Sequence, residues 1–190
     1  MDLIYTLYND ERTVFRLKDV ALLMGETSFS SLNFKLNYYV RTSRLLNPRK
    51  GLYCKPNFNP LELACRIFAP AYISLEYVLQ RAGVIFQYDS RFTALSYLCR
   101  DVEIENQVYS FRKMKNELLI SQQGIEQLGN TVTIATAERA FLDTLYLKGA
   151  TYFDNINPLK KDLIEQILPI YQSKTLNKQV QKIFKDNGLK

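Results

Sequence analysis

The chain has 190 residues, of which 47% are hydrophobic and 23% are charged, with seven glycines and six prolines. These proportions are ordinary for a globular protein and exclude a disordered or low-complexity chain. The sequence contains no histidine, which removes the commonest general base and metal ligand and so excludes most hydrolase mechanisms. The net charge of +6 favours a polyanionic partner.

Neither a membrane span nor a secretion signal is predicted. No stretch reaches the roughly 18 uninterrupted apolar residues that a span needs, and the first five residues lack the features of a signal peptide. We therefore expect a cytoplasmic protein with no membrane partner. Cys54, Cys65 and Cys99 are scattered singly, which predicts small buried apolar residues. We expect no cofactor and no metal site.

The basic residues concentrate at the two ends of the chain. Residues 1–57 hold nine Lys or Arg and five Asp or Glu, residues 58–156 hold nine and eleven, and residues 157–190 hold seven and three. The segment 35–55 carries six basic residues, including Lys55, and no acid. Because a merely solvated face usually mixes charges of both signs, this stripe predicts contact with phosphates.

The chain begins with three predicted helices. Apolar spacing predicts a helix over 2–8, an extended segment at 13–15, and a helix over 17–24 that Gly25 ends. Ser28 can cap the third helix, which follows a short turn. Its buried stripe is predicted to comprise Phe29, Leu32, Leu36, Tyr39 and Val40.

A basic β-hairpin is predicted after the third helix. Residues 44–46 and 52–55 flank the segment 47–51, in which Pro48 presets a turn and Gly51 supplies a left-handed position. This order is typical of a winged helix-turn-helix, whose second motif helix enters the DNA major groove while the hairpin lies along the backbone. The expected DNA-binding residues are Ser30, Ser31, Asn33, Lys35, Asn37, Arg41, Arg44, Arg49 and Lys50.

Residues 56–60, PNFNP, predict a rigid joint between two domains. We expect an α+β fold, with a winged helix-turn-helix domain at 1–57 and a mixed α/β domain with a helical tail at 58–190. Helices are expected at 61–68, at 75–82 after a cap by Ser74, and at 137–147 after a cap by Thr136. Strands are expected at 84–86, 94–98, 102–105, 108–112, 118–121 and 132–135.

Two amphipathic helices are expected from Pro158 to the end of the chain. Their lysines suit a solvated face, since lysine is the usual surface residue of a helix. They also form a second candidate surface for phosphate contact.

Two segments of the second domain resemble a known family. Residues 72–83, YISLEYVLQRAG, and residues 132–145, VTIATAERAFLDTL, are similar in this order to AbiEi-type antitoxins of type IV toxin–antitoxin and abortive-infection systems. The segment RKGLY at 49–53 resembles the wing that precedes them in that family, so the resemblance runs from about Val14 to Leu147. It implies a DNA-binding domain that represses its own operon, and a second domain that counters a nucleotidyltransferase toxin without binding it stably.

Two alternative functions stay open beside this DNA-binding regulator, which we expect not to be an enzyme. A protein-binding module would dock on a toxin or another effector without binding DNA. A magnesium-dependent nuclease would need carboxylates at a shared site, and Asp101, Glu103 and Glu105 alternate along one expected strand. Because no acid-x-Lys element exists, we interpret these acids as a solvated hairpin edge.

Two further expectations concern acids and copy number. Glu76 and Glu138 are interpreted as first-turn or surface acids that favour the helix dipole. One winged module contacts too little DNA for strong selectivity, so we expect a second copy to bind on repeated half-sites of double-stranded operator DNA.

Overall fold

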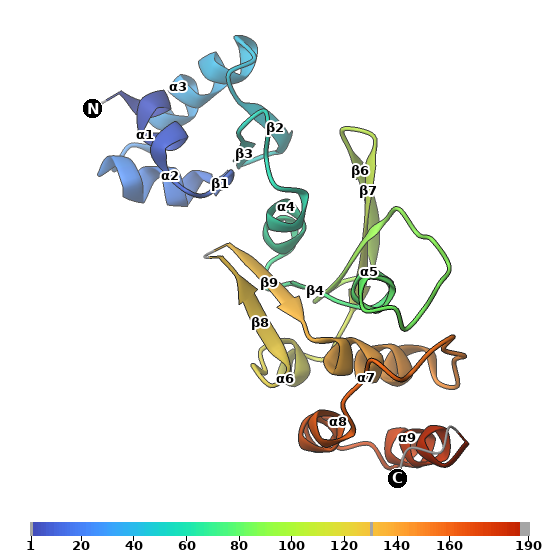
Figure 1. The fold of residues 1–190 in the computed structure, drawn as a ribbon. Helices are drawn as coiled ribbons and strands as arrows, with labels where there is room; N and C mark the ends of the chain where they lie inside the picture. The colour runs from blue at the N-terminus through green and yellow to red at the C-terminus, as the bar shows by residue number, and fades with distance from the viewer. Residues whose placement is uncertain (1, 130, 187–190) are drawn as a thin grey trace.

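The computed structural model describes residues 2–129 and 131–186. The N-terminal elements lie at one end of the molecule, a six-stranded sheet with its helices occupies the middle, and the C-terminal helices lie at the other end (Figure 1). The predicted α+β class is confirmed, because helices and two sheets are both present. Within the described ranges, no helix is long and apolar enough to cross a membrane.

The first elements form a small antiparallel sheet with three helices. In chain order they are α1 (Leu3–Asn9), β1 (Val14–Arg16), α2 (Leu17–Met24), α3 (Phe29–Arg41), β2 (Leu46–Arg49) and β3 (Leu52–Cys54). The strand order is β1-β3-β2. Two predicted helix ends are confirmed: Ser28 Oγ accepts the backbone N–H of Ser31, and Gly25 ends α2 in the left-handed conformation.

These helices enclose a core of their own, which includes Leu7, Phe15 and Leu45. The predicted buried stripe of α3 is only partly correct. Leu32 and Leu36 are buried, whereas Phe29 is 53% exposed. As the first residue of α3, Phe29 lies beyond the end of the core that the next two turns fill.

A mixed six-stranded sheet forms the centre of the molecule. Its strands are β4 (Tyr72–Ile73), β5 (Phe92–Ser96), β6 (Arg100–Ile104), β7 (Gln107–Lys113), β8 (Ile125–Leu128) and β9 (Val132–Ala135). They lie in the order β6-β7-β5-β4-β9-β8, and the pairs β5/β7 and β4/β9 are parallel. The helical elements of this part are α4 (Pro60–Ile67), α5 (Glu76–Arg81), α6 (Asn116–Leu119), α7 (Ala137–Lys148), α8 (Lys161–Ile167), the 3-10 helix η1 (Leu168–Tyr171) and α9 (Lys174–Asp186).

Two predicted strands of this part are wrong. Residues 84–86 form no strand, because the N–H groups of Val84 and Ile85 donate to the Leu79 carbonyl at the end of α5. Residues 118–121 lie in and after α6, where the N–H groups of Leu118 and Leu119 donate to the Lys115 carbonyl. In both places apolar residues follow each other without the alternation that separates a strand from a short helical turn.

Three predictions about single side chains also need correction. Ser74 does not cap α5, because its hydroxyl donates to the Asp143 carboxylate at 2.8 Å. Pro48 lies within β2, and the turn is made by Lys50 and Gly51, whose φ is 76°. Cys99 is exposed, so the prediction that it is buried is wrong, whereas Cys54 and Cys65 are buried as predicted.

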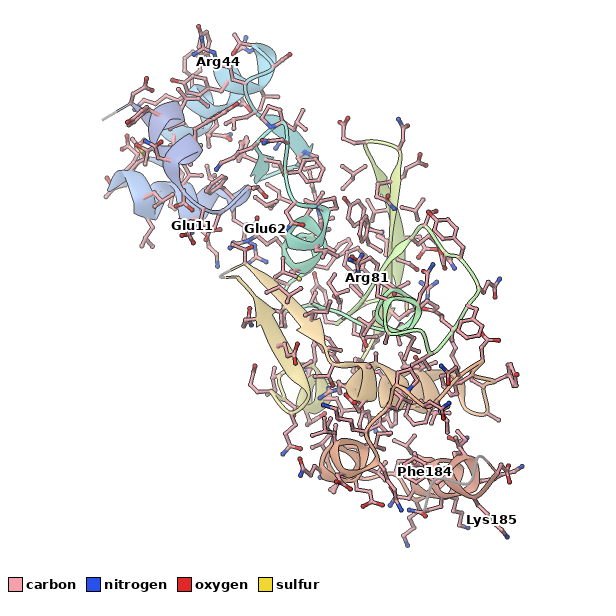
Figure 2. The ribbon with its side chains drawn as sticks, in the orientation of Figure 1. Glu11, Arg44, Glu62, Arg81, Phe184 and Lys185 are labelled. Atoms are coloured by element: carbon pink, nitrogen blue, oxygen red, sulfur yellow. The ribbon has the colours of Figure 1, made fainter. Side chains whose placement is uncertain are left out.

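The two parts of the chain share packing across the predicted boundary between residues 57 and 58. Val14, Leu52 and Cys54 of the small sheet belong to the same buried cluster as the residues of the six-stranded sheet. Glu62 of α4 is 1% exposed and accepts hydrogen bonds from the N–H groups of Thr13 at 2.9 Å and of Val14 at 3.3 Å. Figure 2 marks Glu62 where α4 meets the N-terminal elements. α4 therefore connects the N-terminal elements to the six-stranded sheet.

A buried ion pair on α7 connects the elements on the other side of the sheet. Arg139 and Asp143 are both fully buried, and Arg139 Nε lies 3.1 Å from Asp143 Oδ1. The carboxylate also accepts the hydroxyls of Ser74, Tyr72 and, at 2.6 Å, Tyr171. Burial raises the pKa of Asp143, while Arg139 and the hydroxyls of Tyr171 and Ser74 act in the opposite direction. Three separate chain segments, at β4, α7 and η1, thus meet at one carboxylate.

Arg139→Met should lower the free energy of unfolding by about 3 to 5 kcal/mol, because it leaves Asp143 buried without its cation. Urea unfolding followed by circular dichroism measures this change. The matched control is Glu165→Gln, which breaks the solvent-exposed i,i+4 pair of Lys161 and Glu165 and should cost less than about 0.5 kcal/mol. Equal effects of the two substitutions would contradict the structural role of the buried pair.

Candidate nucleic-acid interface

One side of α3 faces solvent along its whole length. Leu32 and Leu36 point into the core of the N-terminal elements. At about 100° per residue, the opposite side carries Ser30, Phe34, Asn37 and Arg41, one above the other. All four are exposed, and Phe34 is 71% exposed. We call these four residues the outer stripe of α3.

Two members of the outer stripe keep their hydrogen-bonding groups free. In the part of the chain that the structure describes, the side chains of Asn37 and Arg41 make no hydrogen bond or ion pair. Phe34 was not among the predicted contacts, because an aromatic residue in a helix is usually assigned to the core. Its spacing of four residues from Ser30 and three from Asn37 is the signal that places it on the outer stripe.

The other predicted residues of α3 flank the outer stripe and have partners. Asn33 Oδ1 accepts the hydroxyl of Tyr53 at 2.5 Å. Burial raises the pKa of Tyr53, so this hydroxyl stays a donor and fixes the Asn33 amide. Lys35 Nζ lies 3.5 Å from Glu26 Oε2, whereas Ser31 uses only its backbone N–H, which donates to the Ser28 cap. The side chains of Asn33 and Lys35 are therefore less available than those of Asn37 and Arg41.

The basic residues of the hairpin point in different directions. Lys50 is exposed in the turn between β2 and β3. Arg49 instead donates from Nη1 to the Ile67 carbonyl at 3.2 Å, and its guanidinium lies 4.5 Å from the centre of the Phe68 ring. The structure therefore turns Arg49 toward α4 and does not bring it together with the outer stripe.

Two further basic residues near the module have distinct positions. Lys55, part of the predicted basic stripe, is 8% exposed and donates to the carbonyls of Tyr8 and Asp10. The prediction that Lys55 adds to a basic surface is wrong, because its ammonium group is turned inward to the carbonyls at the end of α1. Arg44 lies after α3 at the outer end of the module (Figure 2), and its carbonyl accepts the Tyr8 hydroxyl at 2.8 Å.

A basic cleft of about 360 Å³ lies beside the hairpin. The charged residues that line it are Arg16, Lys18, Arg49, Lys50 and Arg66. Arg16 and Arg49 donate to the consecutive carbonyls of Arg66 and Ile67, at the C-terminal end of α4 where the helix dipole favours cations. Arg66 is ion-paired with Asp19 at 2.9 Å, and no carboxylate lines the cleft itself within the described residues, so the other four basic residues give it a charge that suits a phosphate. The sequence does not reveal this cleft, because its charged residues come from three separate segments.

Asp101 and Glu105, two of the acids considered for metal chemistry, have different structural surroundings. Asp101 accepts Ser110 Oγ at 2.7 Å and pairs with Arg112 at 2.9 Å, and Glu105 lies in the β6–β7 turn with φ of 50°. Across residues 2–129 and 131–186, no group of three His, Cys, Asp or Glu side chains could hold a metal ion.

The two acids of the family-like segments also have structural partners. Glu76 forms an ion pair with Lys148. Glu138 lies in the first turn of α7, as predicted, but it is 5% exposed and accepts the Lys160 backbone N–H at 3.1 Å. Its interpretation as a surface acid is wrong, because the segment before α8 covers it.

No family model matches the chain, and no curated protein matches it. The resemblance to AbiEi-type antitoxins therefore stays a prediction from the sequence. A function has to follow from the geometry and charge of these surfaces.

Arg49→Ala should lower the free energy of unfolding by about 1 kcal/mol, because it removes a charged hydrogen bond and a cation–π contact. Lys50→Ala, its neighbour in the hairpin, should change it by less than about 0.5 kcal/mol. Urea titrations of the two variants provide the comparison. If Lys50→Ala proved as destabilising as Arg49→Ala, the assignment of Arg49 to the α4 contact would be wrong.

Proposed function

We propose that residues 2–54 form a winged helix-turn-helix that binds duplex DNA, with α3 in the major groove and the β2–β3 hairpin as the wing. The order helix, strand, helix, helix, strand, strand supports this proposal, as does the strand order β1-β3-β2. The observation that carries it is the outer stripe of α3. A helix that fills its own core on one side and leaves unpartnered Asn and Arg on the other is suited to groove contact.

The outer stripe offers side chains with complementary preferences for base edges. An asparagine amide can bond N6 and N7 of adenine, an arginine can bond O6 and N7 of guanine, and a phenylalanine can contact the thymine methyl group. Asn37, Arg41 and Phe34 provide one of each. Asn33 is a weaker candidate for base reading, since its amide oxygen already accepts the Tyr53 hydroxyl.

The basic cleft and the hairpin turn supply phosphate contacts beside α3. Lys18 and Lys50 carry the free charges, while Arg16 and Arg49 are held in place by the carbonyls at the end of α4. Such contacts fix the orientation of the protein on the duplex without selecting its sequence. We propose that Lys18 and Lys50 are the main phosphate ligands of the wing side.

Within this proposal the protein is a cytoplasmic transcription regulator of the antitoxin type. The resemblance of residues 72–83 and 132–145 to AbiEi-type antitoxins supports repression of its own operon and action against a nucleotidyltransferase toxin, with a second copy bound on repeated half-sites. These two segments build β4, α5, β9 and α7, including the Arg139–Asp143 pair. They are fold-determining residues, and their presence does not by itself locate the surface that counters a toxin.

Asn37→Ala should reduce the preference for the protein's own upstream DNA over a scrambled duplex by about 5-fold to 150-fold, which corresponds to about 1 to 3 kcal/mol for one base contact. Fluorescence anisotropy titrations with both duplexes measure the preference. Asn157→Ala is the matched control, because Asn157 is also exposed but lies in the loop before α8. Equal weakening on both duplexes would contradict base reading by Asn37.

Titrations of Lys18→Gln and Lys50→Gln at several salt concentrations test the phosphate contacts in the same assay. The slope of log affinity against log salt is negative, and each lost phosphate contact should reduce its magnitude by about 0.9.

A second candidate function is a protein-docking module, favoured by the exposed apolar residues of the same helices. Leu22 is 85% exposed on α2, and Phe34 and Tyr38 are 71% and 54% exposed on α3. Exposed apolar side chains that gather in one region are typical of interaction sites.

Our proposal expects DNA binding by the isolated protein and no stable complex with the product of an adjacent gene. Size-exclusion chromatography with light scattering, on the mixed proteins, tests the second part. A complex of fixed stoichiometry that Leu22→Ser disrupts, together with no preference among duplexes, would replace the DNA-binding function with protein docking.

A further inference from the structure

Helix α9 presents a row of lysines at the end of the molecule opposite α3 (Figure 1). Leu176, Val180 and Phe184 are at most 3% exposed and anchor one side of the helix in the core. The exposed side carries Lys174, Lys178, Lys182 and Lys185. Figure 2 shows Phe184 turned toward the protein and Lys185 pointing away from it. We call these four lysines the α9 row.

The α9 row carries four bases, and the one exposed acid of the helix is Asp186 at its end, four residues after Lys182. Within the described residues, none of its four ammonium groups forms an ion pair, whereas Lys161 on the neighbouring helix pairs with Glu165. The residues between the lysines on the exposed side are Thr175, Asn177 and Gln181, which are polar and uncharged. Like charges three or four residues apart destabilise a helix, and the single acid of this helix side, Asp186, forms no ion pair with the four lysines within the described residues. The row therefore has an arrangement that stability alone does not favour.

The geometry of the row suits a regular chain of negative charges. The lysines lie within an arc of about 80°, and successive members are about 4.5 to 6 Å apart along the axis. A phosphodiester backbone is a regular polyanion, and lysines that neutralise its phosphates release condensed counterions. We propose that the α9 row binds the phosphate backbone of a nucleic acid, without selecting its sequence.

The residue types of the row argue against two other kinds of anionic partner, a protein surface and a membrane. Protein interfaces are enriched in aromatic residues, Met and Arg and are depleted in Lys, whereas the exposed side of α9 offers lysine with small polar residues. A membrane-bound amphipathic helix inserts its apolar side, but that side of α9 is filled by Leu176, Val180 and Phe184 inside the protein. A backbone contact needs only the charges that are present.

This nucleic-acid surface is separate from the outer stripe of α3, because the two helices lie at opposite ends of the molecule (Figure 1). It does not depend on the proposed function of the N-terminal elements. One duplex that lies along α3 would leave the α9 row for another segment of the same nucleic acid or for a second strand.

The test is an anisotropy titration of the full chain with scrambled duplex DNA, single-stranded DNA and single-stranded RNA, between about 50 and 200 mM salt. Changing all four lysines to glutamine should reduce the magnitude of the salt slope by about 3 to 4 on duplex DNA, at about 0.9 per contact, and by somewhat less on single strands. Changing all four to arginine keeps the charge and should preserve the slope. Lys178→Gln alone should reduce its magnitude by about 0.9.

The melting temperature separates binding from folding. Removal of like charges from an exposed helix side should leave it unchanged or raise it. An unchanged salt slope for the glutamine variant on all three nucleic acids would overturn the proposal. The proposal would also be overturned if the glutamine variant lost binding to phosphatidylserine vesicles but kept its nucleic-acid binding. That result would assign the row to a membrane surface.

The α3 variants keep this proposal distinguishable from the proposed function. If Asn37→Ala and Arg41→Gln changed no binding while the glutamine variant of the α9 row abolished it, the α9 proposal would stand and the winged-module proposal would fail. If the α3 variants lost duplex preference and the α9 variant changed nothing, the reverse would hold.

Discussion

The fold depends most on the contacts that a single buried arginine makes. Arg139 pairs with Asp143, donates to the carbonyls of Leu118 and Gln123, and donates to the hydroxyl of Tyr72. These contacts fix α7 to β4 on one side and to the segment around α6 on the other, while Tyr171 ties η1 to the same carboxylate. Because a half-satisfied buried network is worse than an apolar core, all these segments have to be in place together. The tail that carries α9 is positioned by this requirement.

Much of the helical structure could be predicted from the sequence, because its signals are local. Ser28 and Thr136 cap α3 and α7, and Gly25 ends α2, each through atoms within a few residues. The short strands could not be predicted in the same way. β4 is two residues long and exists only because β5 and β9, far away in the sequence, pair with both of its edges. β8 exposes three of its four residues and carries no apolar alternation, so only its pairing with β9 defines it.

The sequence alone could not show which predicted site residues are available for a ligand, for one physical reason. Composition shows which residues are basic or polar, but not which of them already have a partner inside the protein. Lys55 is used by the carbonyls of Tyr8 and Asp10, Arg49 by Ile67, and Asn33 by Tyr53. The partners of Arg49 and Asn33 are 18 and 20 residues away, beyond the range of any local pattern. Only the unpartnered members of the basic stripe remain for an external ligand.

Two arginines of the N-terminal elements are used in contacts with α4, which leaves fewer free cations for a ligand. Arg16 and Arg49 hold the hairpin and β1 against the end of α4, and Glu62 holds β1 against its side. The hairpin therefore has a fixed orientation relative to α4, as the proposed base reading by α3 requires. The same contacts leave few free cations beside α3. Since backbone affinity grows with the number of neutralised phosphates, firm binding then requires either a second copy of the chain or a second basic surface such as the α9 row.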